Sequence, residues 1–576
     1  MEPPTRTTNR QVAAILYKVA EFLDARGERF KPQAYVKAAR SIEALQEDIA
    51  EVSRRGALET IPGVGTNIAA KIREIVDTGR LSYLDNLQRE IPEGIRELVE
   101  VEGIGPKRAQ VLATELGITG IRQLEEAAAA GRVRHVPGFG KQSERKILNT
   151  IRARQHTSTR VLLGDVLPVA EEIVTQLSRN PAARRISLAG SIRRMKETIG
   201  DVDIVATSPM PNDVMAAFCS LSTVGRVIER GATRSSVIHT SGLQVDLRVV
   251  DEDQFGATLL YFTGSKEHNI ALRRRALGRN WRLNEYGITD RATNTVIAGR
   301  DEQGMYLALG LPYIAPELRE NRGEIEAADA GTLPDILLFN SVKGDLHVHT
   351  AWGDGADTVK DMAVAAQARG YEYIAVCDHT ESPHVARGLD GDGIVRQQAE
   401  IEQVNRELDG VTVLAGIECG IGENGALDMS NTVLRDLDIV IGGIHAGLDM
   451  EEPRMTERLL VALQNDYLDV IAHPTGRILL QREPAGFDLA AVSKAAAGLG
   501  VLFEINAFPN RQDLPDTGCI TARKHGARFA LGSDARSGEG LRTMDLGVAT
   551  ARRGWLTAKD VVNTLPLKEL RTVLGS

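Results

Sequence analysis

The segment Leu188–Val205 reads LAGSIRRMKETIGDVDIV and contains the pattern that decides the fold of the central part of this 576-residue chain. A first strand-like run, Ile186–Gly190, ends just before Ser191, and a second run contains Asp201 and Asp203. Side chains at positions i and i+2 of a strand project from the same face. The segment therefore predicts two strands of a mixed sheet, one of which carries two carboxylates side by side.

A third carboxylate is expected on a neighbouring strand, because the run Leu243–Val250 (LQVDLRVV) contains Asp246. Three carboxylates can hold two Mg²⁺ or Mn²⁺ ions about 3.5–4 Å apart, one to activate an attacking hydroxyl and one to stabilise a leaving pyrophosphate. A Gly-Ser pair followed by Asp-x-Asp is typical of nucleotidyltransferases. The alternative is an acidic strand edge without chemistry. Candidate catalytic metal ligands are Asp201, Asp203 and Asp246, and candidate triphosphate-binding residues are Gly190, Ser191, Arg194 and Gly200.

A short glycine pattern occurs three times before this segment, as IPGVGT (61–66), VEGIGP (101–106) and VPGFGK (136–141). Each copy opens an apolar helical run. The GxG step allows a turn with positive φ, and the N–H groups of the next helix can then meet a phosphate oxygen. The copies are similar to helix-hairpin-helix motifs, which hold a DNA backbone without reading its sequence. Structural turns are the alternative. The candidate DNA-binding glycines are Gly63, Gly65, Gly103, Gly105, Gly138 and Gly140.

Two further motifs, LYFTGSKEHN (260–269) and LNEY (283–286), follow the aspartates in the order of a known family. With the three hairpins, residues 11–318 resemble the family X DNA polymerases, the group that includes polymerase beta. The resemblance implies a small lyase-like domain, fingers, palm and thumb, and a preference for deoxynucleotides. It places Tyr261, Phe262 and Gly264 against the incoming sugar, Asn269 against the base and Arg273 in the template minor groove; Arg248 and Glu285 match a palm–thumb switching pair.

The same resemblance makes Lys71 the candidate Schiff-base nucleophile of a lyase, with Tyr35 in support. Phe30 and Asn67 stand where polymerase beta has a histidine and a lysine of its 5′-phosphate pocket, while Lys31 remains. Fewer cations should weaken the grip on that phosphate, so the lyase activity is an open question. In the palm, Gln244 replaces an arginine beside the third aspartate.

The C-terminal part of the chain begins with a second strong pattern, GDLHVHTAWGDG (344–355). It contains His347 and His349 at i and i+2. Five of the 11 histidines lie at the ends of predicted strands, where a barrel of βα units keeps its active site. A mixed His/Asp/Glu set without cysteine suits Mn²⁺, Zn²⁺ or Fe. The candidate ligands are His347, His349, Asp354, His379, Glu418, His445, His473 and Asp534.

Residues 341–576 resemble the PHP domain, a distorted (β/α)7 barrel that uses nine ligands for up to three metals. Eight ligands match here, but the ninth, a histidine, is Arg536, and arginine stays protonated and cannot ligate. Gly420 stands where many such polymerases have an aspartate. We therefore expect two metals or a weakened third, and Arg536 is a candidate phosphate clamp.

In bacterial fusions this domain is similar to Mn²⁺-dependent 3′–5′ exonucleases, some of which process 3′ ends or cleave abasic sites. The leading hypothesis is a DNA-repair polymerase that fills short gaps and trims 3′ ends. Three alternatives remain: a DNA-binding protein whose PHP half is a scaffold, a small-molecule phosphoesterase in that half, and template-independent nucleotidyl transfer. The expected partners are gapped or nicked double-stranded DNA and dNTPs.

Charge is distributed unevenly along the chain. The net charge is −9, but residues 1–340 carry 46 Lys and Arg against 44 Asp and Glu, so the acidity lies in the remainder. Such asymmetry suggests two modules with different ligands. No run of about 20 apolar residues predicts a membrane helix. Four cysteines without a CxxC motif suggest a reducing compartment, so we expect a monomeric protein in the bacterial cytoplasm, associated with the nucleoid.

The fold class expected is multidomain α+β and α/β. Residues 11–150 read as short helices. From Lys343 onward strand-like and helical runs alternate, as in a barrel of βα units. Residues 318–341 are polar, interrupted by proline and glycine, and read as a linker. The expected domains are 1–84 (lyase-like, first hairpin), 85–155 (fingers, second and third hairpins), 156–258 (nucleotidyltransferase palm), 259–317 (thumb), 318–341 (linker) and 342–576 (PHP).

Overall fold

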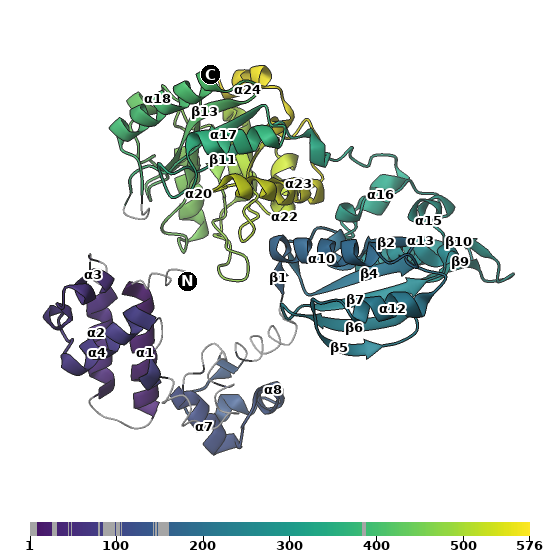
Figure 1. Ribbon diagram of the computed structural model, residues 1–576, viewed down its shortest axis with the longest axis horizontal. Coiled ribbons are helices and arrows are strands. Elements are labelled where there is room, and N and C mark those ends of the chain that lie inside the picture. Colours follow the sequence, from purple (N-terminus) through teal and green to yellow (C-terminus); the bar gives the residue numbers. More distant parts are fainter. Residues whose placement is uncertain are drawn as a thin grey trace. The chain divides into compact units, whose positions relative to one another are not determined.

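The computed structural model divides into two compact units, residues 1–158 and 159–576 (Figure 1). It describes residues 9–25, 31–43, 45, 47, 49–78, 81–84, 98, 104, 106–141, 143–144, 147, 160–382 and 387–575. Three residues singled out in the sequence, Phe30, Gly103 and Gly105, lie outside the described residues. No helix among the described residues is long and apolar enough to cross a membrane.

The first unit is built from helices, as predicted, and no strand occurs in its described residues. Amphipathic helices pack their apolar faces into two separate cores, one formed by residues 12–84 and one by residues 98–147. The elements are α1 (Asn9–Ala25), α2 (Lys31–Glu43), α3 (Ile49–Arg54), η1 (Leu58–Thr60), α4 (Thr66–Thr78), α7 (Pro106–Leu116), α8 (Ile121–Ala129) and η2 (Val133–His135).

The second unit begins with a five-stranded mixed sheet in the order β2-β4-β7-β6-β5. The β4–β7 pair is parallel and the other pairs are antiparallel. All three strands predicted here are present. The strands are β2 (Arg185–Leu188), β4 (Asp201–Thr207), β5 (Val224–Arg230), β6 (Arg234–His239) and β7 (Gln244–Val250), with the short pair β1 (Val161–Leu162) and β3 (Thr198–Ile199). The helices are α10 (Leu163–Ser178), α11 (Gly190–Arg193), α12 (Pro211–Cys219) and α13 (Phe255–Thr263), with η3 (Glu252–Gln254).

A small subdomain follows with its own core. It contains α14 (Lys266–Leu277), the antiparallel strands β8 (Trp281–Asn284), β9 (Gly287–Asp290) and β10 (Val296–Ala298), and α15 (Glu302–Ala308). After it come η4 (Pro316–Leu318), α16 (Glu324–Asp329) and η5 (Phe339–Ser341).

The segment predicted as a linker, residues 318–341, is folded against this subdomain. Its Arg319 is fully buried and donates to Glu302 on α15, and the side chain of Glu324 is also buried. Burial opposes ionisation of Glu302, but Arg319 and Arg193 reverse this and lower its pKa to about 2. The charged residues of this segment form buried ion pairs. Because charged residues usually indicate solvent-exposed chain, the composition alone suggested a linker.

The remainder forms seven parallel strands in sequence order, β11 to β17. Main-chain bonds from Asp534 to His347 and from His349 to Ala535 join the last strand to the first, so the barrel is nearly closed. The alternation of strands and helices predicted from Lys343 onward is present. They are β11 (Gly344–Val348), β12 (Tyr373–Val376), β13 (Thr412–Gly420), β14 (Ile439–Gly443), β15 (Val470–Ala472), β16 (Leu502–Asn506) and β17 (Phe529–Gly532).

Helices cover the outside of the barrel (Figure 1). Their apolar residues and the strands form one extended core. They are α17 (Val359–Ala368), α18 (Gly391–Glu407), α19 (Asn431–Leu434), α20 (Glu452–Ala462), α21 (Leu489–Leu499), α22 (Asp516–Lys524), η6 (Gly538–Thr543), α23 (Met544–Arg553), η7 (Val562–Thr564) and α24 (Leu567–Leu574). The carboxyl ends of the strands are thereby gathered at one end of the barrel.

Candidate active sites

The three palm carboxylates are brought together by the parallel register of β4 and β7, which sets Asp203 directly opposite Asp246. Asp201 lies two residues before Asp203 on the same strand. Burial and the charges of Asp201 and Asp246 raise the pKa of Asp203 to about 7. Burial and Asp246 also raise the pKa of Asp201. Oxygen ligands that repel one another fit hard cations such as Mg²⁺ or Mn²⁺, which would remove the repulsion.

Gly190 forms the wall of this carboxylate site. It has a φ of +66°, and a Cβ added to it would lie 2.6 Å from Oδ2 of Asp203. Gln244 donates to both carboxylate oxygens of Asp246, at 3.3 and 3.2 Å. The amide therefore keeps a direct contact with the third aspartate at the position where the family has an arginine.

The predicted triphosphate cation, Arg194, follows α11 and is held on two sides. It donates to the carbonyl of Thr263, and its Nε lies 3.0 Å from Glu320. The next residue, Gly264, faces it, because a Cβ added there would lie 3.2 Å from Nη1 of Arg194. Arg194 and Gly264 are therefore brought together, whereas the carboxylate partner of Arg194 was not expected from the sequence.

The residues expected around sugar and base gather where α13 meets α14. The Asn269 amide donates to the carbonyl of Tyr261 at 2.7 Å, and Arg273 lies over the Tyr261 ring at 5.2 Å. The rings of Tyr261 and Phe262 meet edge to face at 5.1 Å. The Oδ1 atom of Asn269 is buried without a hydrogen-bond partner.

The expected switching pair is not formed as an ion pair in this structure. The guanidinium of Arg248 lies over the Phe262 ring at 4.2 Å instead. Arg248 and Glu285 nevertheless line one small cavity of about 170 Å³. The two side chains are therefore neighbours across this cavity.

The role of Gly190 is open to a direct test. Gly190→Ala should reduce primer extension about 100-fold, because the added methyl group would push the Asp203 carboxylate out of place, and a displacement of about 1 Å can cost that much in rate. Gly242→Ala is the matched control, since Gly242 also has positive φ (+88°) but a Cβ there meets nothing within 4 Å. Extension by both variants is measured on gapped DNA. Equal losses would show that only backbone strain matters.

All eight predicted barrel ligands converge at the carboxyl ends of the strands. The buried Glu418 lies at the centre, with His445 and His473 at 2.9 and 2.8 Å from Oε1 and His379 at 3.0 Å from Oε2. His349 lies 3.0 Å from Asp534 and 3.6 Å from Asp354. Burial opposes ionisation of Glu418, but His379 and His347 hold its pKa well below the ordinary value.

These side chains have the features of a metal centre. Their ligand atoms form overlapping groups within 4.8 Å of one another, among them His347–His349–Asp534 and Glu418–His445–His473. The Nε2 atoms of His347 and His349 lie only 3.1 Å apart. The Nδ1 atoms of His349, His445 and His473 are buried without a hydrogen-bond partner. The donor set suits borderline divalent ions such as Mn²⁺, Zn²⁺ or Fe²⁺.

Two acidic residues beside this centre were not assigned from the sequence. Glu504, in the middle of β16, accepts from Nδ1 of His347 at 2.6 Å and from the main-chain N–H of His473 at 2.5 Å. Asp378, next to His379, accepts from Thr350 and lies 3.8 Å from His349. The rule that predicted the other ligands, a polar residue at a strand end, does not apply to Glu504, which lies in the middle of β16.

Arg536, at the position of the ninth ligand, extends into the same centre. Its Nε lies 2.8 Å from Asp354, and its Nη1 lies 2.6 Å from Asp534. Its guanidinium also lies 5.5 Å from the Phe508 ring. A fixed positive charge thus bridges two of the eight candidate ligands.

Glu504 should act on the metals through His347. Glu504→Gln should weaken Mn²⁺ binding about 10- to 100-fold, because the amide no longer orients and polarises the imidazole. Titration of the metal-free protein with Mn²⁺, followed by electron paramagnetic resonance, measures this directly. Glu372→Gln, which removes only a partner of Lys343 at the surface, is the control. Unchanged affinity in Glu504→Gln would reject the positioning role.

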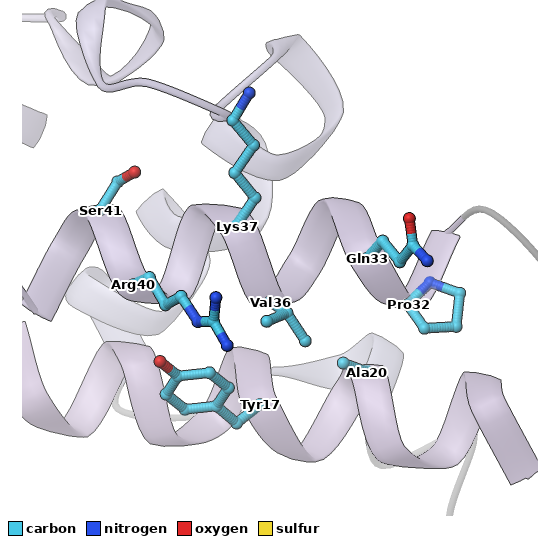
Figure 2. A pocket seen from close by; sticks show the side chains of 8 residues that line it. All are labelled: Tyr17, Ala20, Pro32, Gln33, Val36, Lys37, Arg40 and Ser41. Carbon is cyan, nitrogen blue, oxygen red and sulfur yellow. The ribbon is translucent and has the colours of Figure 1, made fainter.

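The lyase candidate Lys71 lies on α4, with its ammonium 4.8 Å from the Tyr83 ring. Tyr83 in turn stacks on Tyr35 at 6.5 Å, and burial with the nearby Tyr83 raises the pKa of Tyr35 to about 12. Tyr83 was not expected from the sequence. The groove of about 640 Å³ between α1 and α2 lies elsewhere, since neither Lys71 nor Tyr35 lines it (Figure 2).

Two of the three hairpins fall within the described residues, and both turn as predicted. Gly63 and Gly138 have positive φ, of +88° and +83°. A Cβ added to Gly65, Gly138 or Gly140 would meet nothing within 4 Å, so the backbone is open on that side. Open main-chain N–H groups at a helix start suit a phosphate oxygen.

Comparison with known families agrees with this architecture. The chain matches the DNA polymerase beta thumb over residues 258–320 and the PHP domain over residues 345–505. It also matches a helix-hairpin-helix domain over residues 7–81 and a SAM-like helix-hairpin-helix tandem over residues 95–153. Hairpins, thumb and barrel together define a family X type of polymerase joined to a PHP domain.

Three relatives place the chain more closely. It is 35% identical over 568 residues to the DNA polymerase/3′-5′ exonuclease PolX of Bacillus subtilis (strain 168), covering 98% of this chain and 99% of the relative. It is 23% identical to DNA polymerase lambda of Rattus norvegicus over 54% of this chain and 56% of the relative. A probable phosphatase of Thermoanaerobacter sp. (strain X514) is 27% identical over 38% of this chain and 89% of its own length. The chain belongs to the PolX family of DNA polymerases/3′-5′ exonucleases.

Proposed function

We propose that this chain fills short DNA gaps by nucleotidyl transfer at Asp201, Asp203 and Asp246, and shortens 3′ ends at its PHP centre. The observation that carries the first part is the register that sets Asp203 opposite Asp246. Mg²⁺ or Mn²⁺ bound by the three carboxylates would supply charge neutralisation at the attacking and leaving oxygens. The other roles are those of Gly190, Ser191, Arg194 and Gly200 at the triphosphate, Tyr261, Phe262 and Gly264 at the sugar, Asn269 at the base and Arg273 at the template.

The substrates follow from this assignment. The hairpin glycines Gly63, Gly65, Gly138 and Gly140, with Gly103 and Gly105, would hold gapped or nicked double-stranded DNA by its backbone. The incoming nucleotide would be a dNTP. The chain would work as a monomer in the bacterial cytoplasm, on DNA of the nucleoid. The lyase role of Lys71 belongs to the same proposal and is supported by its position beside Tyr83 and near Tyr35.

The nuclease assignment rests on the convergence of His347, His349, Asp354, His379, Glu418, His445, His473 and Asp534 at one end of the barrel. Mn²⁺ held there would supply an activated water for phosphodiester hydrolysis. A scaffold or a small-molecule phosphoesterase is not favoured, because the relative that spans the whole chain is a DNA polymerase/3′-5′ exonuclease. Residues that bind metals in the barrel are separate from those of the palm.

The two activities should therefore be separable. Asp246→Ala should abolish extension of a 5′-labelled primer at a one-nucleotide gap and leave shortening in Mn²⁺ without dNTPs. His347→Ala with His349→Ala should do the reverse. Asp213→Ala, at an exposed position on α12, should change neither. Extension that survives in Asp246→Ala would overturn the carboxylate assignment, and shortening that survives in the histidine double variant would move the nuclease elsewhere.

The number of barrel metals follows from Arg536. A guanidinium paired with both Asp354 and Asp534 supplies positive charge where a further ion would otherwise be bound. We therefore assign two ions to the PHP centre, one at His347, His349 and Asp534 and one at Glu418, His445 and His473. The two carboxylates fix two of the Arg536 donors, so the guanidinium would be held in place to face the phosphate of the DNA substrate.

Arg536→His should raise the Mn²⁺ content by about one ion per chain, because an imidazole replaces the competing cation with a ligand. Inductively coupled plasma mass spectrometry of the dialysed variant and of the unmodified protein gives the difference, in which the palm ions cancel. Arg542→His, on the exposed part of η6, controls for an added histidine. An unchanged metal content would mean that Arg536 does not take the place of an ion.

A further inference from the structure

The palm loop formed by residues 193–198 joins α11 to β3 and contains Arg194, the proposed triphosphate cation. Two arginines of the PHP barrel hold this loop. Arg553, at the end of α23, donates to the main-chain carbonyl of Arg194 at 2.7 Å. Arg477, four residues after His473, donates to the carboxylate of Glu197 at 2.9 Å. The loop is therefore fixed from the barrel at two points.

Arg553 is the more enclosed of these contacts, with a side chain only 4% exposed. Besides the Arg194 carbonyl it contacts Glu320 at 3.0 Å and Asp516 at 2.6 Å. Glu320 is shared, because the same Oε1 atom accepts from Nε of Arg194 at 3.0 Å. Burial opposes ionisation of Glu320, but Arg194 and Arg553 lower its pKa, so one carboxylate bridges two guanidinium groups.

This bridge determines the direction of the Arg194 side chain. Glu320 takes its Nε, and the carbonyl of Thr263 takes its Nη1. These two bonds hold different nitrogens of the planar guanidinium, so the orientation of the group is set before any nucleotide arrives. If Arg553 were removed, the charge of Glu320 would be balanced by Arg194 and Lys196, so Glu320 would draw more strongly on Arg194, and Arg194 would become a weaker partner for a phosphate.

We propose that the PHP barrel is a structural part of the polymerase's nucleotide site, because Arg553 holds Arg194 in position for the triphosphate of the incoming nucleotide. The proposal rests on the triphosphate role given above to Arg194. Arg553 is a positioning residue, since it acts through the Arg194 carbonyl and through Glu320. The ligand class concerned is the nucleoside triphosphate.

The palm and the barrel should remain docked when Arg553 is changed. A Cβ added to Gly164, at the start of α10, would lie 2.9 Å from Pro509 and 3.2 Å from Leu546. Leu546, on α23, is buried in the apolar core of the palm. This close apolar contact is independent of the ion pairs, so the effect of one arginine can be measured in the assembled protein.

The test is steady-state gap filling by the full-length Arg553→Gln variant. The KM for the dNTP should rise about tenfold with kcat changed little, because a charge-assisted contact to the loop is lost. Arg552→Gln is the matched control. Arg552 is the neighbour of Arg553 on α23, pairs with Glu317 at 2.8 Å and forms no hydrogen bond or ion pair with Arg194, Glu197 or Glu320. Its KM should stay within about twofold.

A second substitution distinguishes positioning from general damage. Adding Glu320→Gln to Arg553→Gln should bring the KM back toward that of the unmodified protein, since it removes the charge that draws on Arg194. Shortening of 3′ ends without dNTPs should be unchanged in both variants. A KM for Arg553→Gln equal to that of Arg552→Gln, or losses in KM, kcat and shortening together, would overturn the proposal.

These outcomes are separate from the test of the polymerase itself. If Asp246→Ala keeps its extension activity, the proposed function fails first. If Arg194→Gln leaves the KM unchanged, the triphosphate role of Arg194 fails, whatever Arg553 does. If Asp246 and Arg194 behave as expected and Arg553→Gln does not, only the inference about the barrel is lost.

Discussion

Carboxylates placed close together are the constraint on which both candidate sites depend. In the palm, the parallel pairing of β4 and β7 sets Asp203 against Asp246, and the direct partner of Asp246 is the neutral amide of Gln244. Two like charges at such a distance cannot both be stable without a cation. The strand register therefore places these carboxylates where bound metal ions would relieve their mutual repulsion.

The barrel answers the same constraint differently. Glu418 is surrounded by histidines, and Asp354 and Asp534 are bridged by the guanidinium of Arg536. Part of the negative charge is thus neutralised by the chain itself. The guanidinium of Arg536 is part of the chain, so it cannot exchange with solvent as a metal ion does, and it has no coordination sphere for a substrate oxygen. It can therefore orient a phosphate but cannot activate water.

Sequence patterns predicted the strands and most of the residues that the structure brings together, because those depend on local features. Asp201 and Asp203 share a face by strand geometry alone, and His347 and His349 do so at the end of β11. Partners chosen by tertiary packing were beyond reach: Glu320 for Arg194, Tyr83 for Lys71, and Phe262 rather than Glu285 for Arg248. Glu504 was also missed, because it lies in the middle of the buried strand β16 rather than at its end.

The segment 318–341 shows why composition misled. Its charged residues suggested exposed chain, but Arg319 is buried between Glu302 and the rings of Tyr306 and Tyr313. Residue types alone do not distinguish an ion pair that is buried in a core from one that is exposed to water. The difference lies in the partner, and here the partner is supplied by α15, which the sequence places immediately before the segment.

The contacts between the barrel and the palm would give the PHP domain a structural role in addition to metal binding. Arg477 and His473 belong to one loop, four residues apart, so the loop that provides a ligand at the metal centre also contacts Glu197 of the palm. Arg511 extends the link, since its carbonyl accepts from Arg477 and its side chain lies 3.5 Å from Asp534. A displacement of the palm loop would therefore also displace two candidate metal ligands, His473 and Asp534. The palm contacts are made by Arg477 and Arg553, not by Gly420 or Arg536, so altered metal binding is compatible with the proposed support of the nucleotide site within one domain.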